Sequence, residues 1–88
     1  MNSQNSACLV CGHLTVSEPG HFEICPVCFW EDEGDIVDPN IPTYGPNGDL
    51  SLTGAKENYS KYGAIEKQYI DKVRPAMDSE VPSQSKNK

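Results

Sequence analysis

The first third of the chain contains short runs of alternating hydrophobic and polar residues, which are typical of β-strands. Leu14-Thr15-Val16 is one such run, and Ser17-Glu18-Pro19-Gly20, which follows it, has the proline and glycine of a turn. His21-Phe22-Glu23-Ile24 then predicts the return strand. We therefore expect one short β-hairpin, with a modest apolar face formed by Leu14, Val16, Phe22 and Ile24.

In the last third of the chain the hydrophobic period becomes that of a helix. Ser51 is suited to the N-cap, and Gly63 to the position after the last turn, where glycine accepts a left-handed conformation. A second helical segment is expected after Gly63, ending at Arg74-Pro75. Each segment has one apolar stripe, formed by Leu52, Ala55, Tyr59 and Tyr62 in the first and by Ile65, Tyr69, Ile70 and Val73 in the second.

Glycine and proline recur through residues 31–50, so we expect a long irregular loop there. Together the patterns predict a single domain over residues 7–75, made of a ribbon (7–30), the loop (31–50) and the helices (51–74). The polar ends, residues 1–6 and 76–88, are expected to be disordered. The apolar residues that can anchor the loop are Ile36, Val37, Ile41 and Tyr44.

All four cysteines lie in the predicted ribbon as two C-x-x-C pairs, Cys8 with Cys11 and Cys25 with Cys28. Two facing pairs make the tetrahedron of thiolates that Zn²⁺ accepts in structural sites. We predict one structural zinc ion bound by all four residues. A rubredoxin-like iron centre is a less favoured use of these ligands, and so is a dithiol oxidoreductase, because that chemistry needs a strand-to-helix βαβ setting.

The remaining polar residues form no recognisable catalytic set. His13 and His21 are expected at the surface or beside the metal rather than as ligands, because the four cysteines already complete a coordination shell. The acidic run in residues 31–38 lacks the spacing of a calcium-binding loop, so we expect it to be solvated. A closed four-cysteine site leaves no open coordination position for catalysis. We therefore expect a protein that is not an enzyme.

The two cysteine tips differ at the position that follows each pair. Gly12 follows the first pair, where a positive φ is expected, whereas Phe29 follows the second. Either Phe29 accepts a strained φ or the second turn has another shape. Phe29 and Trp30 are expected to cover the metal side, and an aromatic binding platform is the less favoured alternative.

The composition indicates that the fold needs a metal for stability, and it disfavours two classes of partner. A chain of 88 residues that is 36% hydrophobic is rarely stable on its apolar core alone. Its net charge of −6 disfavours nucleic acid and anionic membranes. The N-terminus lacks the basic and apolar runs of a signal peptide, and no stretch approaches the ~20 apolar residues of a transmembrane helix. We therefore expect a cytoplasmic protein, in which paired cysteines bind metal rather than form disulfides.

The chain resembles the cysteine-rich CPCC family of small bacterial proteins. One match is residues 22–32, Phe-Glu-Ile-Cys-Pro-Val-Cys-Phe-Trp-Glu-Asp, of which residues 23–32 are the most specific part. Further matches lie at residues 11–15, at Leu52, and at residues 55–59 and 62–64. The resemblance implies a metal-binding, zinc-ribbon or rubredoxin-like protein of unknown function, and it points towards a protein-binding role. The family is named for a Cys-Pro-Cys-Cys run, whereas this chain has Cys8-Leu9-Val10-Cys11. Any activity of the middle thiol should therefore be absent, while the metal-binding pair is kept.

We thus predict a small α+β protein with a zinc-ribbon (rubredoxin-like) hairpin carrying two C-x-x-C tips, a long loop and two C-terminal helical segments. Its predicted function is non-enzymatic: structural zinc holds a module that binds another protein. The alternative is a rubredoxin-like iron electron carrier. A two-stranded ribbon cannot cover both helical stripes and the loop, so an apolar surface should stay exposed beside the acidic run and favour a partner with a basic rim. The aromatic residues from which this surface would be drawn are Phe29, Trp30, Tyr44, Tyr59, Tyr62 and Tyr69.

Overall fold

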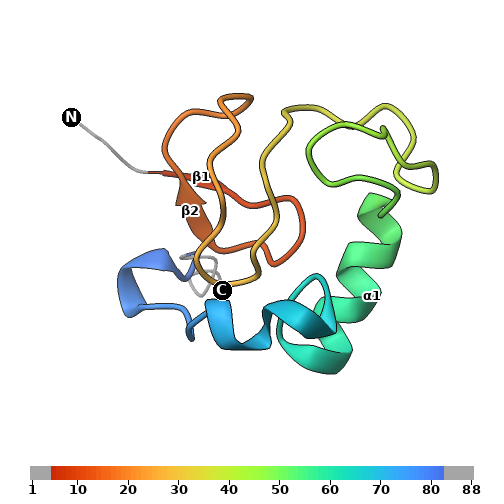
Figure 1. Cartoon of the computed structure of the whole chain (residues 1–88). Helices are drawn as coiled ribbons and strands as arrows, with labels where there is room; N and C mark the ends of the chain where they lie inside the picture. Colours follow the sequence, from red (N-terminus) through yellow and green to blue (C-terminus); the bar gives the residue numbers. More distant parts are fainter. Residues whose placement is uncertain (1–4, 83–88) are drawn as a thin grey trace, which may run out of the picture.

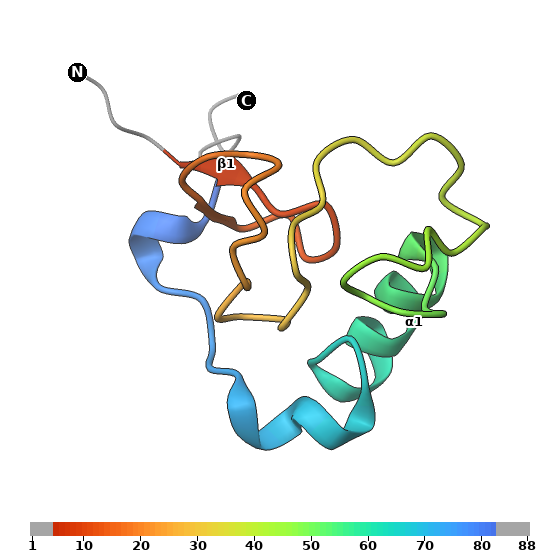
Figure 2. The ribbon, with the colours of Figure 1, turned by 45° about the horizontal axis from the view of Figure 1, so that its top comes forward.

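The computed structural model of the chain describes residues 5–82. It contains the strands β1 (Ser6–Ala7) and β2 (Leu14–Val16), the α-helix α1 (Leu52–Tyr62), and the 3-10 helices η1 (Lys67–Lys72) and η2 (Asp78–Glu80). In Figure 1, α1 lies on the side opposite β1 and β2, and the chain after α1 runs back beneath the N-terminal third towards the strands. Figure 2 shows the same arc from a second direction. The small α+β architecture is as predicted, and it is consistent with a zinc-ribbon-like fold.

The predicted strand at Leu14–Val16 is present as β2, but its partner is β1. The two strands are antiparallel, with Ser6 opposite Val16. The turn between them carries the first cysteine pair, and the Cys8 N–H donates to the His13 carbonyl at 2.8 Å. Ser6 therefore belongs to a strand rather than to the expected disordered N-terminus.

Residues 22–32 form a second hairpin around the second cysteine pair. The Phe22 N–H donates to the Asp32 carbonyl at 2.9 Å, and the Cys25 N–H donates to the Trp30 carbonyl at 2.9 Å. The predicted pairing of residues 21–24 with β2 is therefore wrong, as is the prediction of one hairpin built from these two segments. Each C-x-x-C segment is itself a tight turn that brings its own flanks together, so pairing occurs on either side of each cysteine turn rather than across residues 17–20.

The helix α1 begins and ends where the sequence predicts. The Ser51 side chain accepts a hydrogen bond from the Gly54 N–H at 3.0 Å, as an N-cap does. Gly63 has a φ of +80°, and its N–H donates to the Tyr59 carbonyl at 2.8 Å, which closes the last turn. The buried residues of α1 are Leu52 and Ala55.

The second helical segment is shorter than predicted. Only Lys67–Lys72 is helical, as the 3-10 helix η1. The Ile65 N–H donates to the Cys28 carbonyl at 2.9 Å, and the Ile65 carbonyl accepts from the Asn58 side chain at 2.8 Å. The bond from Asn58 takes the Ile65 carbonyl out of a helical ladder, and the bond to Cys28 fixes this segment to the second cysteine pair. The predicted helix over residues 64–74 is therefore wrong in its first turn.

The chain beyond residue 75 continues along the N-terminal third of the molecule. Glu80 is buried and accepts two hydrogen bonds from the Arg74 guanidinium, at 2.9 and 2.8 Å. The helix η2, which contains Glu80, contacts β2. The disordered tail expected from residue 76 is therefore wrong for residues 76–82, and residues 83–88 lie outside the described part. In residues 5–82, no helix is long and apolar enough to span a bilayer.

The irregular loop is fixed by its acidic residues more than by apolar anchors. Buried Asp32 accepts a hydrogen bond from the Gly20 N–H. Glu33 accepts from the Thr43 hydroxyl at 2.6 Å and from the Asn47 side chain at 2.8 Å. The acidic run is thus only partly solvated, contrary to expectation. Of the predicted anchors, Ile36 packs against the core, whereas Val37, Ile41 and Tyr44 are exposed.

The core is centred on the cysteines rather than on an apolar ribbon face. Val16 is buried, but Phe22 and Ile24 are 55% and 48% exposed, so the predicted four-residue apolar face does not form. The buried core cluster comprises Cys8, Val10, Val16, Cys25, Val27, Cys28, Trp30, Leu52, Ala55 and Ile65.

Candidate metal centre

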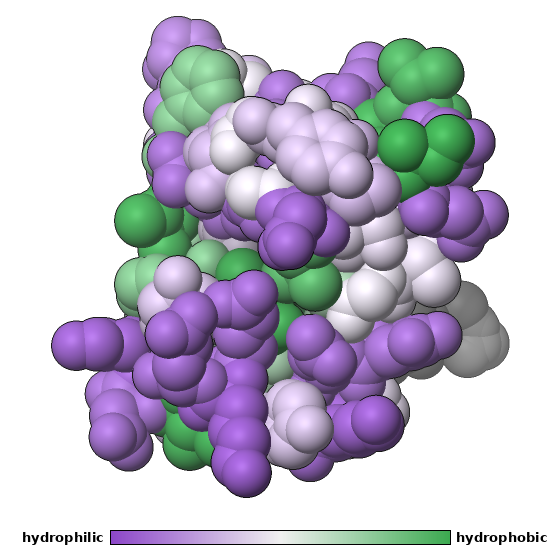
Figure 3. All heavy atoms as spheres, turned by 45° about the vertical axis from the view of Figure 1, so that its right-hand side comes forward, coloured by the Kyte–Doolittle hydropathy of each residue, from purple (hydrophilic) through white to green (hydrophobic). Residues whose placement is uncertain are grey.

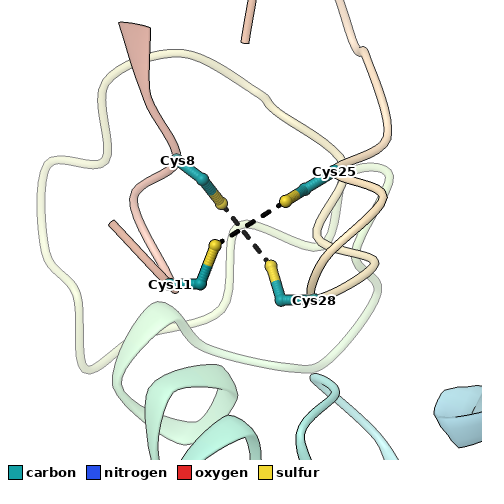
Figure 4. A group of neighbouring side chains, drawn as sticks. All are labelled: Cys8, Cys11, Cys25 and Cys28. Carbon is teal, nitrogen blue, oxygen red and sulfur yellow. Dashed lines mark hydrogen bonds between the residues drawn. The ribbon is translucent and has the colours of Figure 1, made fainter. Parts of the chain in front are cut away.

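The two hairpins bring all four cysteine side chains to one point. The four sulfur atoms lie within 4.8 Å of one another. In Figure 4 they point towards a common centre, and the lines that join Cys8 to Cys28 and Cys11 to Cys25 cross there. These two separations are 3.5 and 3.7 Å. A tetrahedron with metal–sulfur bonds of about 2.3 Å has sulfur–sulfur edges of about 3.8 Å. The sulfurs are therefore spaced as a four-thiolate metal site requires.

The same separations exclude disulfides. A disulfide has a sulfur–sulfur distance of about 2.05 Å, and all four cysteines are free. Among residues 5–82, these cysteines are the group whose donor atoms converge closely enough to hold a metal ion. His21 instead lies exposed beside Glu18, 3.4 Å from its carboxylate, and His13 is not in the cluster either.

The two tips have the same backbone conformation. In the first, the Gly12 N–H donates to the Cys8 carbonyl at 2.9 Å; in the second, the Phe29 N–H donates to the Cys25 carbonyl at 2.8 Å. Gly12 and Phe29 both have a φ of +78°. The alternative left open by the sequence is thus resolved, because Phe29 adopts the conformation that glycine accepts more easily.

This conformation of Phe29 is strained, but the Phe29 side chain makes a contact that offsets the strain. A left-handed conformation costs a residue with a Cβ about 1–2 kcal/mol. The Phe29 ring stacks on Tyr69 of η1, with ring centroids 4.3 Å apart. An aromatic pair of this kind contributes about 0.5–1.5 kcal/mol beyond its burial, which offsets much of the strain. Trp30, next in the chain, is almost wholly buried in the core cluster that contains the cysteines, and Phe29 is partly buried against that cluster.

Two hydrogen bonds to sulfur support the cluster. The Val10 N–H donates to the Cys8 sulfur at 3.4 Å, and the Thr15 hydroxyl donates to the Cys25 sulfur at 3.1 Å. Such donors stabilise the negative charge of metal-bound thiolates and orient the ligands. Sequence reasoning missed Thr15. The available signal was its position as the one polar residue in the strand that follows the first tip.

Crowding of the thiols separates their pKa values. Hydrogen bonding from Cys11 lowers the pKa of Cys25, and the same contact raises the pKa of Cys11. Contacts with Cys11 and Cys25 raise the pKa of Cys28. Four adjacent thiolates need a cation to compensate their charge, so a metal ion must displace protons and its affinity rises with pH.

The site is closed to solvent on most sides. Cys8, Cys25 and Cys28 are buried, and Cys11 is partly buried. Four protein thiolates fill a tetrahedral shell and leave no position for a substrate or water. The arrangement suits a metal that holds two hairpins together.

Comparison with protein-family models gives a match over residues 6–80, to a family described as cysteine-rich CPCC. The chain belongs to the cysteine-rich CPCC family. A search among curated proteins found no match. Val10, which stands where the resemblance places the middle cysteine of the Cys-Pro-Cys-Cys run, is buried in the core beside Cys8. In this member, that position is therefore used for packing.

Proposed function

We propose that this CPCC protein is a non-enzymatic metal-binding protein whose single structural Zn²⁺ holds together a module that binds another protein. The observation that carries the metal half is the convergence of four sulfurs at tetrahedral spacing inside the core. A thiolate tetrahedron selects zinc or iron. Zinc is the better choice here because it is redox-inert and needs only ligands and geometry.

The metal acts in this proposal as the main stabilising element. The buried cluster contains three of the four cysteines and only small groups of apolar residues from each part of the chain. Structural zinc in small domains supplies an apparent binding free energy of about 10–16 kcal/mol. A cytoplasmic location agrees with this role, because thiols stay reduced there.

The interaction half rests on the exposed surface. Several large hydrophobic side chains are exposed, among them Ile41 at 57% and Tyr44 at 73%. Figure 3 shows hydrophobic groups in separate patches among hydrophilic ones, rather than as one continuous apolar face. Separate small patches suit a reversible partner more than a permanent subunit. The net charge of −6 makes nucleic acid and anionic membranes poor partners.

The iron-carrier alternative is favoured by the matching backbone of the two tips, since repeated tips of this kind can hold iron as well as zinc. Elemental analysis of protein prepared without chelator from cells supplied with both metals separates the two. We expect one zinc per chain and no visible absorption. A red protein with iron at one per chain would replace the zinc proposal with the electron carrier.

The interaction half has its own test. Zinc-loaded chain and the Cys25→Ser variant are used in parallel to capture proteins from the native host under cross-linking. We expect a protein retained only by the loaded form, because the metal holds the module together. If both baits retain the same proteins, or neither retains any, the interaction role fails while the metal role stands.

A further inference from the structure

A pocket of about 270 Å³ opens between three parts of the molecule: the second hairpin, residues 46–50 of the loop, and residues 65–69. One wall is apolar and includes the stacked rings of Phe29 and Tyr69. Ile24, at its edge, is 48% exposed. The pocket therefore has a hydrophobic surface that the fold itself leaves open to solvent.

The rest of the lining is acidic. Three acidic residues line the pocket, Glu31, Asp49 and Glu66, and no lysine, arginine or histidine of residues 5–82 does. In residues 5–82, none of the three takes part in an ion pair. Their oxygens do not converge as a metal site requires, because within the described residues the convergent group is the cysteine cluster. The charge is spread around an apolar wall, which suits an extended organic cation more than a compact metal ion.

The acidic rim is held in place by the fold. The Asn47 side chain accepts a hydrogen bond from the Glu31 N–H at 3.1 Å and donates to the Glu31 carbonyl at 2.8 Å. On the opposite side, the Ile65 N–H is fixed to the Cys28 carbonyl of the second tip. Preformed walls reduce the ordering that a ligand must drive on binding.

We propose that this pocket binds an arginine side chain presented by a short, apolar-flanked segment of a partner protein. A guanidinium group packs on aromatic rings, pairs with carboxylates through a planar fork of donors and is more weakly hydrated than an ammonium group. The apolar flanks of the segment cover Ile24 and the aromatic wall. The inference rests on the interaction half of the proposed function and names the chemistry of the partner.

The test is a ¹⁵N–¹H NMR titration of zinc-loaded protein with the peptide acetyl-Ala-Leu-Arg-Leu-Ala-amide. We expect saturable shifts confined to the amides that line the pocket, which are those of Ile24, Phe29, Glu31 and residues 47–50 and 65–69. The peptide with lysine in place of arginine should bind several-fold more weakly, and the peptide with alanine there should not bind measurably.

Two matched double variants locate the charge effect. Asp49→Asn with Glu66→Gln removes two carboxylates from the pocket, and we expect it to weaken binding by about tenfold, as two partly exposed charge pairs would. Asp35→Asn with Glu57→Gln removes the same charge outside the pocket lining and should leave binding within about twofold. Zinc content is measured on every sample.

Several results would overturn the inference. They are the absence of saturable binding, shifts spread over other acidic segments, equal loss in both double variants, or equal binding of the arginine and alanine peptides. Shifts at the same amides on dilution would show that a second copy of the chain occupies the pocket, and shifts caused by Ca²⁺ alone would show a cation site. If zinc stays at one per chain while peptide binding fails, the metal role stands and only the partner assignment is lost.

Discussion

The first cysteine tip is followed by Gly12 and the second by Phe29, yet both residues have a φ of +78°. Within the described part of the chain, a Cβ at Gly12 would meet nothing within 4 Å, so a side chain at this position would have no contact to make there. Phe29, in contrast, stacks on Tyr69 of η1. The same backbone turn thus serves two purposes: the first tip presents two sulfurs, and the second also attaches the C-terminal part of the chain.

Further hydrogen bonds confirm that the second tip is the junction. The Cys28 carbonyl accepts from the Ile65 N–H at 2.9 Å, and the Pro26 carbonyl accepts from the Arg74 N–H at 3.0 Å. Metal geometry requires the two cysteine tips to have the same backbone conformation. It leaves the side chain of the residue after each cysteine pair free to differ. A strained residue is tolerated where its side chain makes a contact that no glycine can make.

The largest expected effect is that of removing one sulfur from either tip. Cys25→Ser and Cys8→Ser should each lose zinc and the folded state, because the metal contributes about 10–16 kcal/mol in small zinc domains and a typical domain is stable by only about 5–15 kcal/mol. Zinc content and amide dispersion in NMR spectra measure this, with exposed Ser60→Ala as the control. A folded, zinc-free Cys25→Ser protein would show that the metal role is overrated.

The strain at the second tip gives the next largest effect. Phe29→Ala should destabilise zinc-loaded protein by about 2 kcal/mol, because it keeps the positive φ and removes the aromatic contact. Phe29→Gly should destabilise the protein by about 1 kcal/mol less than Phe29→Ala does, since glycine relieves the strain at the positive φ.

Denaturant unfolding in a zinc buffer compares these variants. Gly12→Ala is the counterpart in the first tip, where we expect a loss of about 1–2 kcal/mol from φ strain alone. If Phe29→Gly is less stable than Phe29→Ala, the strain at the second tip is absent and the comparison between the tips fails.

Thr15 connects the tips, since it lies in the first hairpin and donates to a sulfur of the second. Thr15→Val keeps the shape and removes the donor, so we expect zinc affinity to fall by about tenfold. Competition with a chromophoric chelator measures the change, and Thr15→Ser, which keeps a hydroxyl, is the matched control. A loss in Thr15→Ser that Thr15→Val does not show would assign the effect to packing of the methyl group instead, because valine keeps that methyl and serine does not.

The smallest effect is expected at the ion pair between Arg74 and Glu80, which we call the C-terminal clasp. Arg74 holds the pKa of Glu80 at about 2, below its ordinary value of 4.5, so the clasp is fully formed above that ordinary value and is lost only as pH falls towards about 2. Zinc is released from thiolates before so low a pH is reached. Glu80→Gln should therefore speed exchange of the Met77 amide, which donates to Glu80, by a factor that stays constant wherever zinc remains bound.

Hydrogen-exchange NMR at several pH values measures this factor, and Asp78→Asn, an exposed neighbour in η2, serves as the control. A factor that shrinks as pH falls from about 5.5 to about 4.5, while zinc is still bound, would indicate a carboxyl with an ordinary pKa and no clasp.

Local signals made part of the fold predictable. The cysteine spacing brought together the right four side chains, and Ser51 and Gly63 marked the ends of α1 because capping depends on residues next to the helix. The strand Leu14–Val16 was also predictable, but its partner was not. A fold with two hairpins and a fold with one hairpin have the same alternation of hydrophobic and polar residues in the sequence. The choice between them depends on which neighbouring segments each cysteine-containing turn brings together.

The C-terminal part was less predictable because distant contacts decide it. Ile65 has the spacing of a helical stripe, yet its N–H is bound to the Cys28 carbonyl, which is remote in sequence. The partnership of Arg74 with Glu80 likewise turns a polar segment into a structured one. In both places tertiary contacts override local propensity.

The central claim, that four thiolates from two like tips bind one metal ion, is tested most directly by X-ray absorption spectroscopy of the zinc-loaded protein. The account predicts a zinc shell of four sulfur atoms at about 2.3 Å and no nitrogen or oxygen ligand. A shell with three or fewer sulfurs, completed by imidazole or water, would contradict it.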